Sequence, residues 1–152
     1  MSVTMEQVLT KLAPIEPDYD DAVRLGPDAL PHLERLAEGP DTLMAAKAIS
    51  LASMINTSRT LPLLLKASQN AAPAVRVQAA WGVGNLPPEA AQRVLAVLLD
   101  DADAGVRSVS LRSSRKVFPR GSLPAAIEQQ IAALSRDDPE PSIREASAQL
   151  LI

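Results

Sequence analysis

The stretch Ala72–Leu86 reads APAVRVQAAWGVGNL and decides the fold. Val75, Ala79, Val83 and Leu86 stand at i, i+4, i+8 and i+11, so they form one stripe along a helix of 3.6 residues per turn. The pattern recurs when 31 is subtracted from or added to each position, at Met44, Ala48, Ala52 and Ile55 and at Val106, Ser110, Ser114 and Val117. The stretch is therefore one copy of a repeat.

A second helical pattern precedes each copy at the same spacing. Its aligned apolar positions are Leu33, Leu64 and Leu95, and then Leu36, Ala67 and Leu98. Two helical patterns in a unit of about 31 residues indicate an α-solenoid. One helix pair cannot bury its apolar stripe alone, so neighbouring pairs must cover it. We therefore expect an all-α stack of antiparallel helix pairs, about five in this chain.

The segment Val75-Arg76-x-x-Ala79-x-x-x-Val83-Gly84-x-Leu86 resembles the second helix of a HEAT-type repeat, and in particular the short bacterial variety called PBS-lyase HEAT-like. Val106-Arg107 and Ile143-Arg144 repeat its Val-Arg signature, and Asp103 is similar to the acidic turn residue of that family. The resemblance covers roughly residues 26–152 and implies a right-handed α–α superhelix. It is specific for the fold and implies no particular function.

Two departures from this family pattern are present. Met44-Ala45 replaces Val-Arg, so the first regular repeat lacks the arginine that, in the family, ties neighbouring repeats together. Ser114-Arg115 stands where Val83-Gly84 stands. The resemblance implies that Arg107 belongs to the ladder between repeats, together with Arg76 and Arg144.

We expect a single domain, residues 1–152, because chains of this length usually form one. Residues 1–25 fit the period poorly and are interpreted as an N-terminal cap pair. The regular repeats are 26–56, 57–87 and 88–118, and a longer loop at 119–124 precedes the C-terminal pair in 119–152. The expected helices of these pairs are 27–38, 41–55, 58–70, 73–86, 88–100, 104–118, 124–135 and 141–151.

Charge is unevenly distributed along the chain. Residues 1–41 carry nine acids and three bases, residues 42–121 four acids and ten bases, and residues 122–152 five acids and two bases. Such an acidic–basic–acidic order can mark a partner surface. The sequence has no cysteine, no apolar run long enough to span a membrane and no signal-like start. We expect a cytoplasmic protein that does not bind membranes.

Residue types that carry catalysis are sparse. His32 is the only histidine and is expected at the surface; no nucleophile elbow or phosphate-binding glycine loop is present, since Gly82 and Gly84 lie inside a helix. The acids at 16–21 and 100–103 are expected to cap helices. We therefore predict no enzyme activity, no metal and no cofactor. Some relatives attach bilins, but no residue supports that activity here.

The second helix of each repeat is expected to face a concave groove. Its outward positions are Ala46, Ser50, Ser53 and Met54, then Val77, Trp81, Gly84 and Asn85, then Ser108, Arg112, Arg115 and Lys116. Trp81 would lie beside Arg112, in a common anchor pairing at interfaces, or would only lean over a neighbouring helix. The predicted partner-binding residues are Val77, Trp81, Asn85, Arg112, Arg115, Lys116 and Arg120.

These features favour a non-catalytic protein-interaction or scaffold module that binds an acidic or amphipathic partner segment along the groove. The alternative is nucleic-acid binding through the basic patch of residues 112–120, which the overall acidity disfavours. We expect a monomer or a weak homodimer. The apolar end Leu150-Leu151-Ile152 is expected to fold inward, the alternative being a second molecule that covers it.

Overall fold

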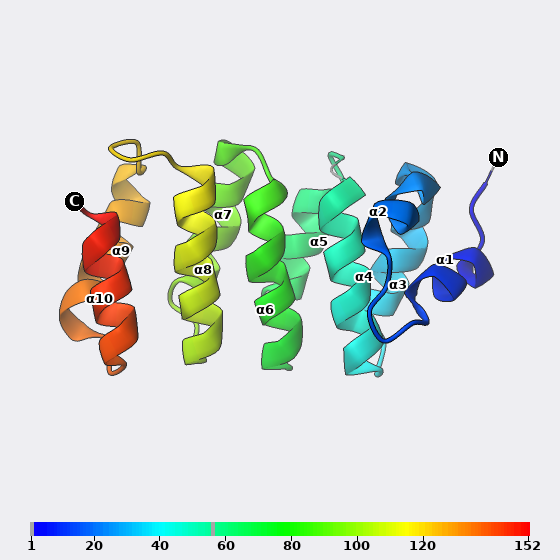
Figure 1. Cartoon of the computed structure of the whole chain (residues 1–152), viewed down its shortest axis with the longest axis horizontal. Helices are drawn as coiled ribbons and strands as arrows, with labels where there is room; N and C mark the ends of the chain where they lie inside the picture. The colour runs from blue at the N-terminus through cyan, green and yellow to red at the C-terminus, as the bar shows by residue number, and fades with distance from the viewer. Residues whose placement is uncertain (1, 56) are drawn as a thin grey trace.

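The computed structural model describes residues 2–55 and 57–152. The predicted boundaries at residues 1 and 56 lie outside these residues. In the described part of the chain every regular element is helical. The protein is an α-solenoid in which helix pairs follow one another along one axis (Figure 1).

The N-terminal pair consists of α1 and α2, and four further pairs follow it. The helices are α1 (Met5–Leu12), α2 (Tyr19–Ala22), α3 (Leu30–Glu38), α4 (Thr42–Ile55), α5 (Thr60–Ala67), α6 (Pro73–Gly82), α7 (Pro88–Leu98), α8 (Ala104–Val117), α9 (Ala125–Asp137) and α10 (Pro141–Leu150). Short 3₁₀ helices extend them at Val23–Leu25, Pro27–Ala29 and Val83–Asn85.

The helices form two layers. The second helices α4, α6, α8 and α10 stand side by side, and the first helices α3, α5, α7 and α9 lie behind them in Figure 1. Each second helix packs against the second helix of the next pair, and each first helix does the same in its own layer. The layers enclose a continuous core whose largest fully buried side chains are Leu, Ile and Val, for example Leu33, Leu64 and Leu95.

Small side chains let the second helices approach closely. A Cβ atom placed on Gly82 would lie 2.8 Å from Ser53 Cβ and 3.3 Å from both methyl carbons of Leu64. Ser110 and Ser114 are fully buried in α8, and each hydroxyl donates to the carbonyl four residues earlier. These buried hydroxyls are thereby satisfied without a partner from another helix.

Helix starts use the expected caps. Thr4 begins α1 with a reciprocal pair of hydrogen bonds to Gln7, and the Asp18 carboxylate accepts the Asp21 amide at the start of α2. Asp103 accepts the Val106 amide at the start of α8, 3.1 Å away. The acids near the N-termini of α2 and α8 therefore include capping residues.

Arginines tie consecutive pairs together, as predicted. The Arg76 guanidinium donates to Asp101 at 2.8 and 3.1 Å, and the Arg107 guanidinium donates to Asp138 at 2.7 and 3.1 Å. Each also donates to two carbonyls of the loop before its own helix. Arg144 differs from this prediction: it donates to the Asp138 carbonyl of the loop before its own helix, at 2.6 Å, and has no such bond to another described pair. The ladder thus runs through the loops between first and second helices.

Three expectations are wrong. Ser53 is buried rather than outward, because the side-chain-free Gly82 lets α6 approach it closely. His32 is partly buried rather than on the surface, because the N-terminal segment covers it and its Nε2 donates to the Val3 carbonyl at 2.7 Å. Leu151 and Ile152 do not fold inward, since they are 36% and 78% exposed. None of the described helices is long and apolar enough to cross a bilayer.

Candidate partner-binding surface

The central second helices α4, α6 and α8 contain no acidic residue. Their six cations fall into two groups. Three are engaged within the fold: Lys47 is buried, and Arg76 and Arg107 belong to the ladder. The other three, on α8, are exposed and, among the described residues, form no ion pair: Arg112, Arg115 and Lys116. The exposed face of these three helices therefore carries positive charge that the fold does not neutralise.

Trp81 stands on this face, on α6. Its side chain is 47% exposed, and the Arg112 guanidinium carbon lies 6.0 Å from the centre of its ring. The repeat offset places the two on adjacent helices at the same height, as predicted. A guanidinium at this distance is attracted by the negative face of the indole ring. The pair places a flat apolar surface and a cation side by side.

A line of polar contacts crosses the same three helices. Lys116 Nζ donates to Asn85 Oδ1 at 3.4 Å, and Asn85 Nδ2 donates to Ser53 Oγ at 3.3 Å. The Lys116 side chain also covers Gly84, where an added Cβ would meet it at 2.9 Å. The predicted residues Asn85 and Lys116 are thereby joined to each other beside Trp81.

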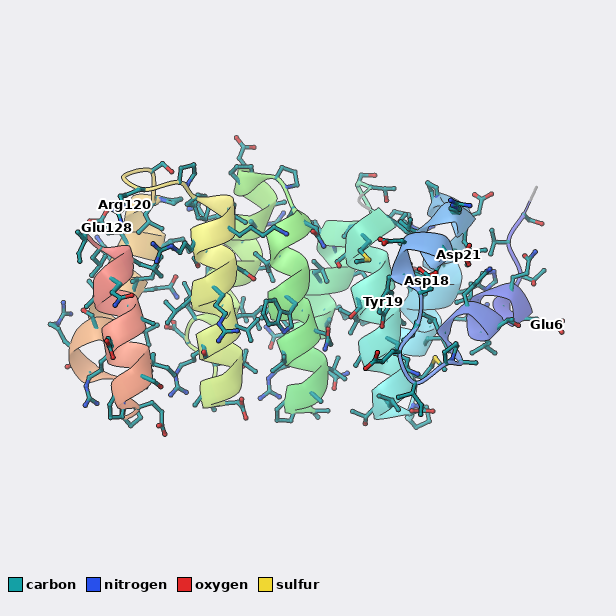
Figure 2. The ribbon with its side chains drawn as sticks, in the orientation of Figure 1. Glu6, Asp18, Tyr19, Asp21, Arg120 and Glu128 are labelled. Carbon is teal, nitrogen blue, oxygen red and sulfur yellow. The ribbon has the colours of Figure 1, made fainter. Side chains whose placement is uncertain are left out.

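A second polar line leads toward the N-terminal pair. Ser50, which aligns with Trp81 one repeat earlier, donates to Gln78 Oε1 at 2.7 Å. Tyr19 of α2 lies next to Ser50: burial raises the pKa of the Tyr19 hydroxyl, and a hydrogen bond with Ser50 offsets part of that rise. Figure 2 shows Tyr19 on the side of the molecule that faces the viewer, beside α4. The sequence interpretation missed Gln78, which lies one position beyond the predicted Val77.

The remaining predicted residues occupy different positions. Val77 is only half-buried and packs against the core, so it contributes part of its surface. Arg115 and Arg120 line a separate hollow between the ends of α8 and α10. Figure 2 shows Arg120 at the C-terminal end of the molecule, near Glu128. The predicted set therefore divides into a cluster around Trp81 and a pair of arginines at the hollow.

Lys47 has a role that residue patterns did not reveal. It lies in α4, where the family arginine is absent, and its Nζ donates to the carbonyls of Leu12 and Pro14 at 3.0 and 2.7 Å. It thus binds the C-terminal end of α1, where helix carbonyls lack partners within the helix. Only the placement of the N-terminal pair, which has no repeat spacing, could reveal this contact.

Comparison with known proteins settles the family. The family model described as HEAT repeats matches residues 30–115, more than half of the chain. The chain belongs to the HEAT-repeat family. No curated protein matches it.

Among solved structures, the chain is similar to one from the complex of CpcE and CpcF of phycocyanin lyase from Nostoc sp. PCC7120, at 20% identity and a TM-score of 0.78. The match covers 97% of this chain and 98% of that chain. At this identity the similarity shows a common fold, which agrees with the resemblance to PBS-lyase HEAT-like repeats.

Proposed function

We propose that this chain is a non-catalytic protein-interaction module that binds an acidic, amphipathic partner segment across α6 and α8. The observation that carries the proposal is the half-exposed Trp81 beside the exposed Arg112, on helices without a single carboxylate. Tryptophan and arginine are among the residue types most enriched at positions that dominate binding energy in interfaces. The similar solved structure comes from a complex of two protein chains, which also supports a protein partner.

Charge determines which segment fits. Arg112, Arg115 and Lys116 are exposed, and the described part of the chain offers them no ion pair. Carboxylates from a partner would therefore gain attraction without displacing an existing acid. An apolar partner side chain would cover Trp81. The partner segment accordingly carries acidic residues that face the cations, with an apolar residue between them that covers Trp81.

Peptide selection tests the proposal directly. Peptides selected from a random display library on the wild-type protein are expected to be rich in Asp and Glu around an apolar residue. Trp81 is the only tryptophan, so its fluorescence reports binding to this surface in each protein that retains it. Fluorescence anisotropy of a dye-labelled peptide measures binding to all variants, including those that lack Trp81. The double variant Trp81→Ala, Arg112→Glu is expected to lose peptide binding, and circular dichroism should show that it keeps its helices.

The matched control is Arg93→Glu, which makes the same charge change at an exposed position of α7 in the other layer. Peptides that bind this control and the double variant equally would show that the surface is elsewhere. Nucleic-acid binding is the competing outcome. It would appear as affinity for single- or double-stranded DNA that falls steeply with salt, since phosphate contacts release counterions.

A further inference from the structure

A hollow opens where α8 and α10 end. It has a volume of about 140 Å³ and is lined by Arg115, Phe118, Pro119, Arg120, Gly121, Leu123, Gln149 and Leu150. Phe118 is only 7% exposed and forms an apolar floor. This open hollow is large enough to take ordered water or one side chain.

The charged side chains that line the hollow are all cationic. Two arginines and one amide supply all its charged and strongly polar side chains, and no acid lines it among the described residues. Neither arginine forms an ion pair in the described part of the chain. A guanidinium fork matches a carboxylate and binds it with charge-assisted hydrogen bonds. Leu123, Leu150 and Phe118 suit a short apolar stem behind that carboxylate.

Two features of the hollow disfavour the binding of an anion. The carbonyl ends of α8 and α10 meet here, and such ends favour cations. Glu128 lines an adjoining hollow that shares Leu123 and Leu150 with this one. Arg115 lies in the last turn of α8 and therefore offsets part of the negative helix end. Arg120 lies beyond the helix in the loop, so the end of α8 alone does not explain its place on this wall.

We propose that this hollow is a second anchoring site, which takes a glutamate side chain of the partner segment that crosses Trp81. The inference rests on the proposed function for the identity of the partner. Glutamate carries its carboxylate on a two-carbon apolar stem, which matches arginines at the edge and an apolar floor.

Spacing allows one segment to reach both anchors. Adjacent packed helices lie about 8–10 Å apart, and the hollow is between one and two helices away from α6. Arg112 and Phe118 are six positions apart at the end of α8, a rise of about 9 Å. The two anchors are therefore separated by roughly 15–20 Å, which an extended chain spans in about five or six residues.

The site is tested with small probes, independently of any partner. Sodium hexanoate, which joins a carboxylate to a short alkyl chain, is titrated into the wild-type protein and followed by the methyl NMR signals of Leu123 and Leu150. We expect saturable shifts, with no saturation for 1-hexanol or acetate. Arg120→Gln should weaken hexanoate binding at least about tenfold, because a charged hydrogen-bond donor is lost. Arg93→Gln should leave it unchanged.

Several outcomes would overturn the inference. Equal binding of hexanol and hexanoate would show an apolar surface with no role for the arginines. No saturable binding in the wild type, or no loss in Arg120→Gln, would show that the arginines serve only the helix ends. Trp81→Ala should leave hexanoate binding intact. Failure of the Trp81 surface in peptide selection and failure of the hollow are thus read from separate experiments.

Discussion

Arg107 and Asp138 form an almost buried ion pair that joins the α7–α8 loop to the α9–α10 loop. Their side chains are 10% and 1% exposed, and two parallel hydrogen bonds of 2.7 and 3.1 Å connect them. The remaining Arg107 nitrogen donates to the carbonyls of Asp101 and Ala102. One guanidinium therefore fixes two consecutive repeats in their relative orientation.

Replacing Asp138 by alanine is expected to destabilise the protein by about 3 kcal/mol, because it leaves a buried guanidinium without its counter-charge. Urea unfolding at pH 7 measures this loss. Glu34→Ala is the matched control: it breaks the exposed pair with Arg59 and should cost less than about 1 kcal/mol. Equal costs for the two variants would show that burial gives the Arg107 pair no special weight.

The same pair makes stability depend on acid. Burial raises the pKa of Asp138, but the hydrogen bonds from Arg107 and from the Glu140 amide, with the charges of Arg107 and Arg144, outweigh it and hold the pKa below its usual value. The unfolded chain then binds this proton more readily than the folded chain does. The pair therefore contributes its full stability above about pH 4 and loses it as pH falls through the folded-state pKa.

Comparing wild-type protein with Asp138→Asn isolates this effect. The difference in unfolding free energy between them is expected to be largest near pH 7 and to shrink below about pH 4, where the wild-type carboxylate becomes protonated. Urea titrations at several pH values from 7 to 3 measure it. A difference that stays constant over this range would show that Asp138 acts through shape rather than charge.

The stack of helix pairs follows from apolar periodicity alone. Among the three regular repeats, adding 31 to each position of one helix gives the next, and this arithmetic places Arg112 beside Trp81 as the structure shows. It also accounts for the missing rung of the ladder. Asn70 is one repeat before Asp101 and forms the same turn, since the side-chain oxygen of each accepts the amide two residues on. Asn70 is uncharged, and the position one repeat before Arg76 is Ala45, so no ion pair forms between them.

The failures arise where contacts lack the repeat spacing. Ser53 aligns with Arg115, which is exposed, yet Ser53 is buried because it packs against a glycine one helix away. His32 is covered by the N-terminal segment, and the hollow needs the non-periodic loop after Phe118. A pattern within one helix contains no information about these neighbours.

Lys47→Met should loosen the N-terminal pair. The substitution keeps an unbranched apolar stem but removes the donor to the Leu12 and Pro14 carbonyls, which leaves acceptors in a buried site without partners. We expect the free energy of unfolding to fall by about 1–3 kcal/mol. Relative to wild type, amide hydrogen exchange should become faster in residues 5–25, and by more than it does in α8. Lys66→Met, at an exposed position of α5, should leave exchange of the N-terminal pair unchanged.

Gly82→Ala tests the close approach of α4 and α6. Its added Cβ would lie 2.8 Å from Ser53 Cβ, which moves only with the backbone of α4, so α4 and α6 must separate. The Leu64 methyl groups, at 3.3 Å, must shift as well. We expect a destabilisation of about 1–3 kcal/mol, although alanine favours a helix more than glycine does. Gly39→Ala is the control, because its Cβ would make ordinary contacts of 3.4 Å or more. Thermal unfolding of both variants measures the difference, and a Gly82→Ala protein as stable as Gly39→Ala would show that the α4–α6 contact tolerates a wider spacing.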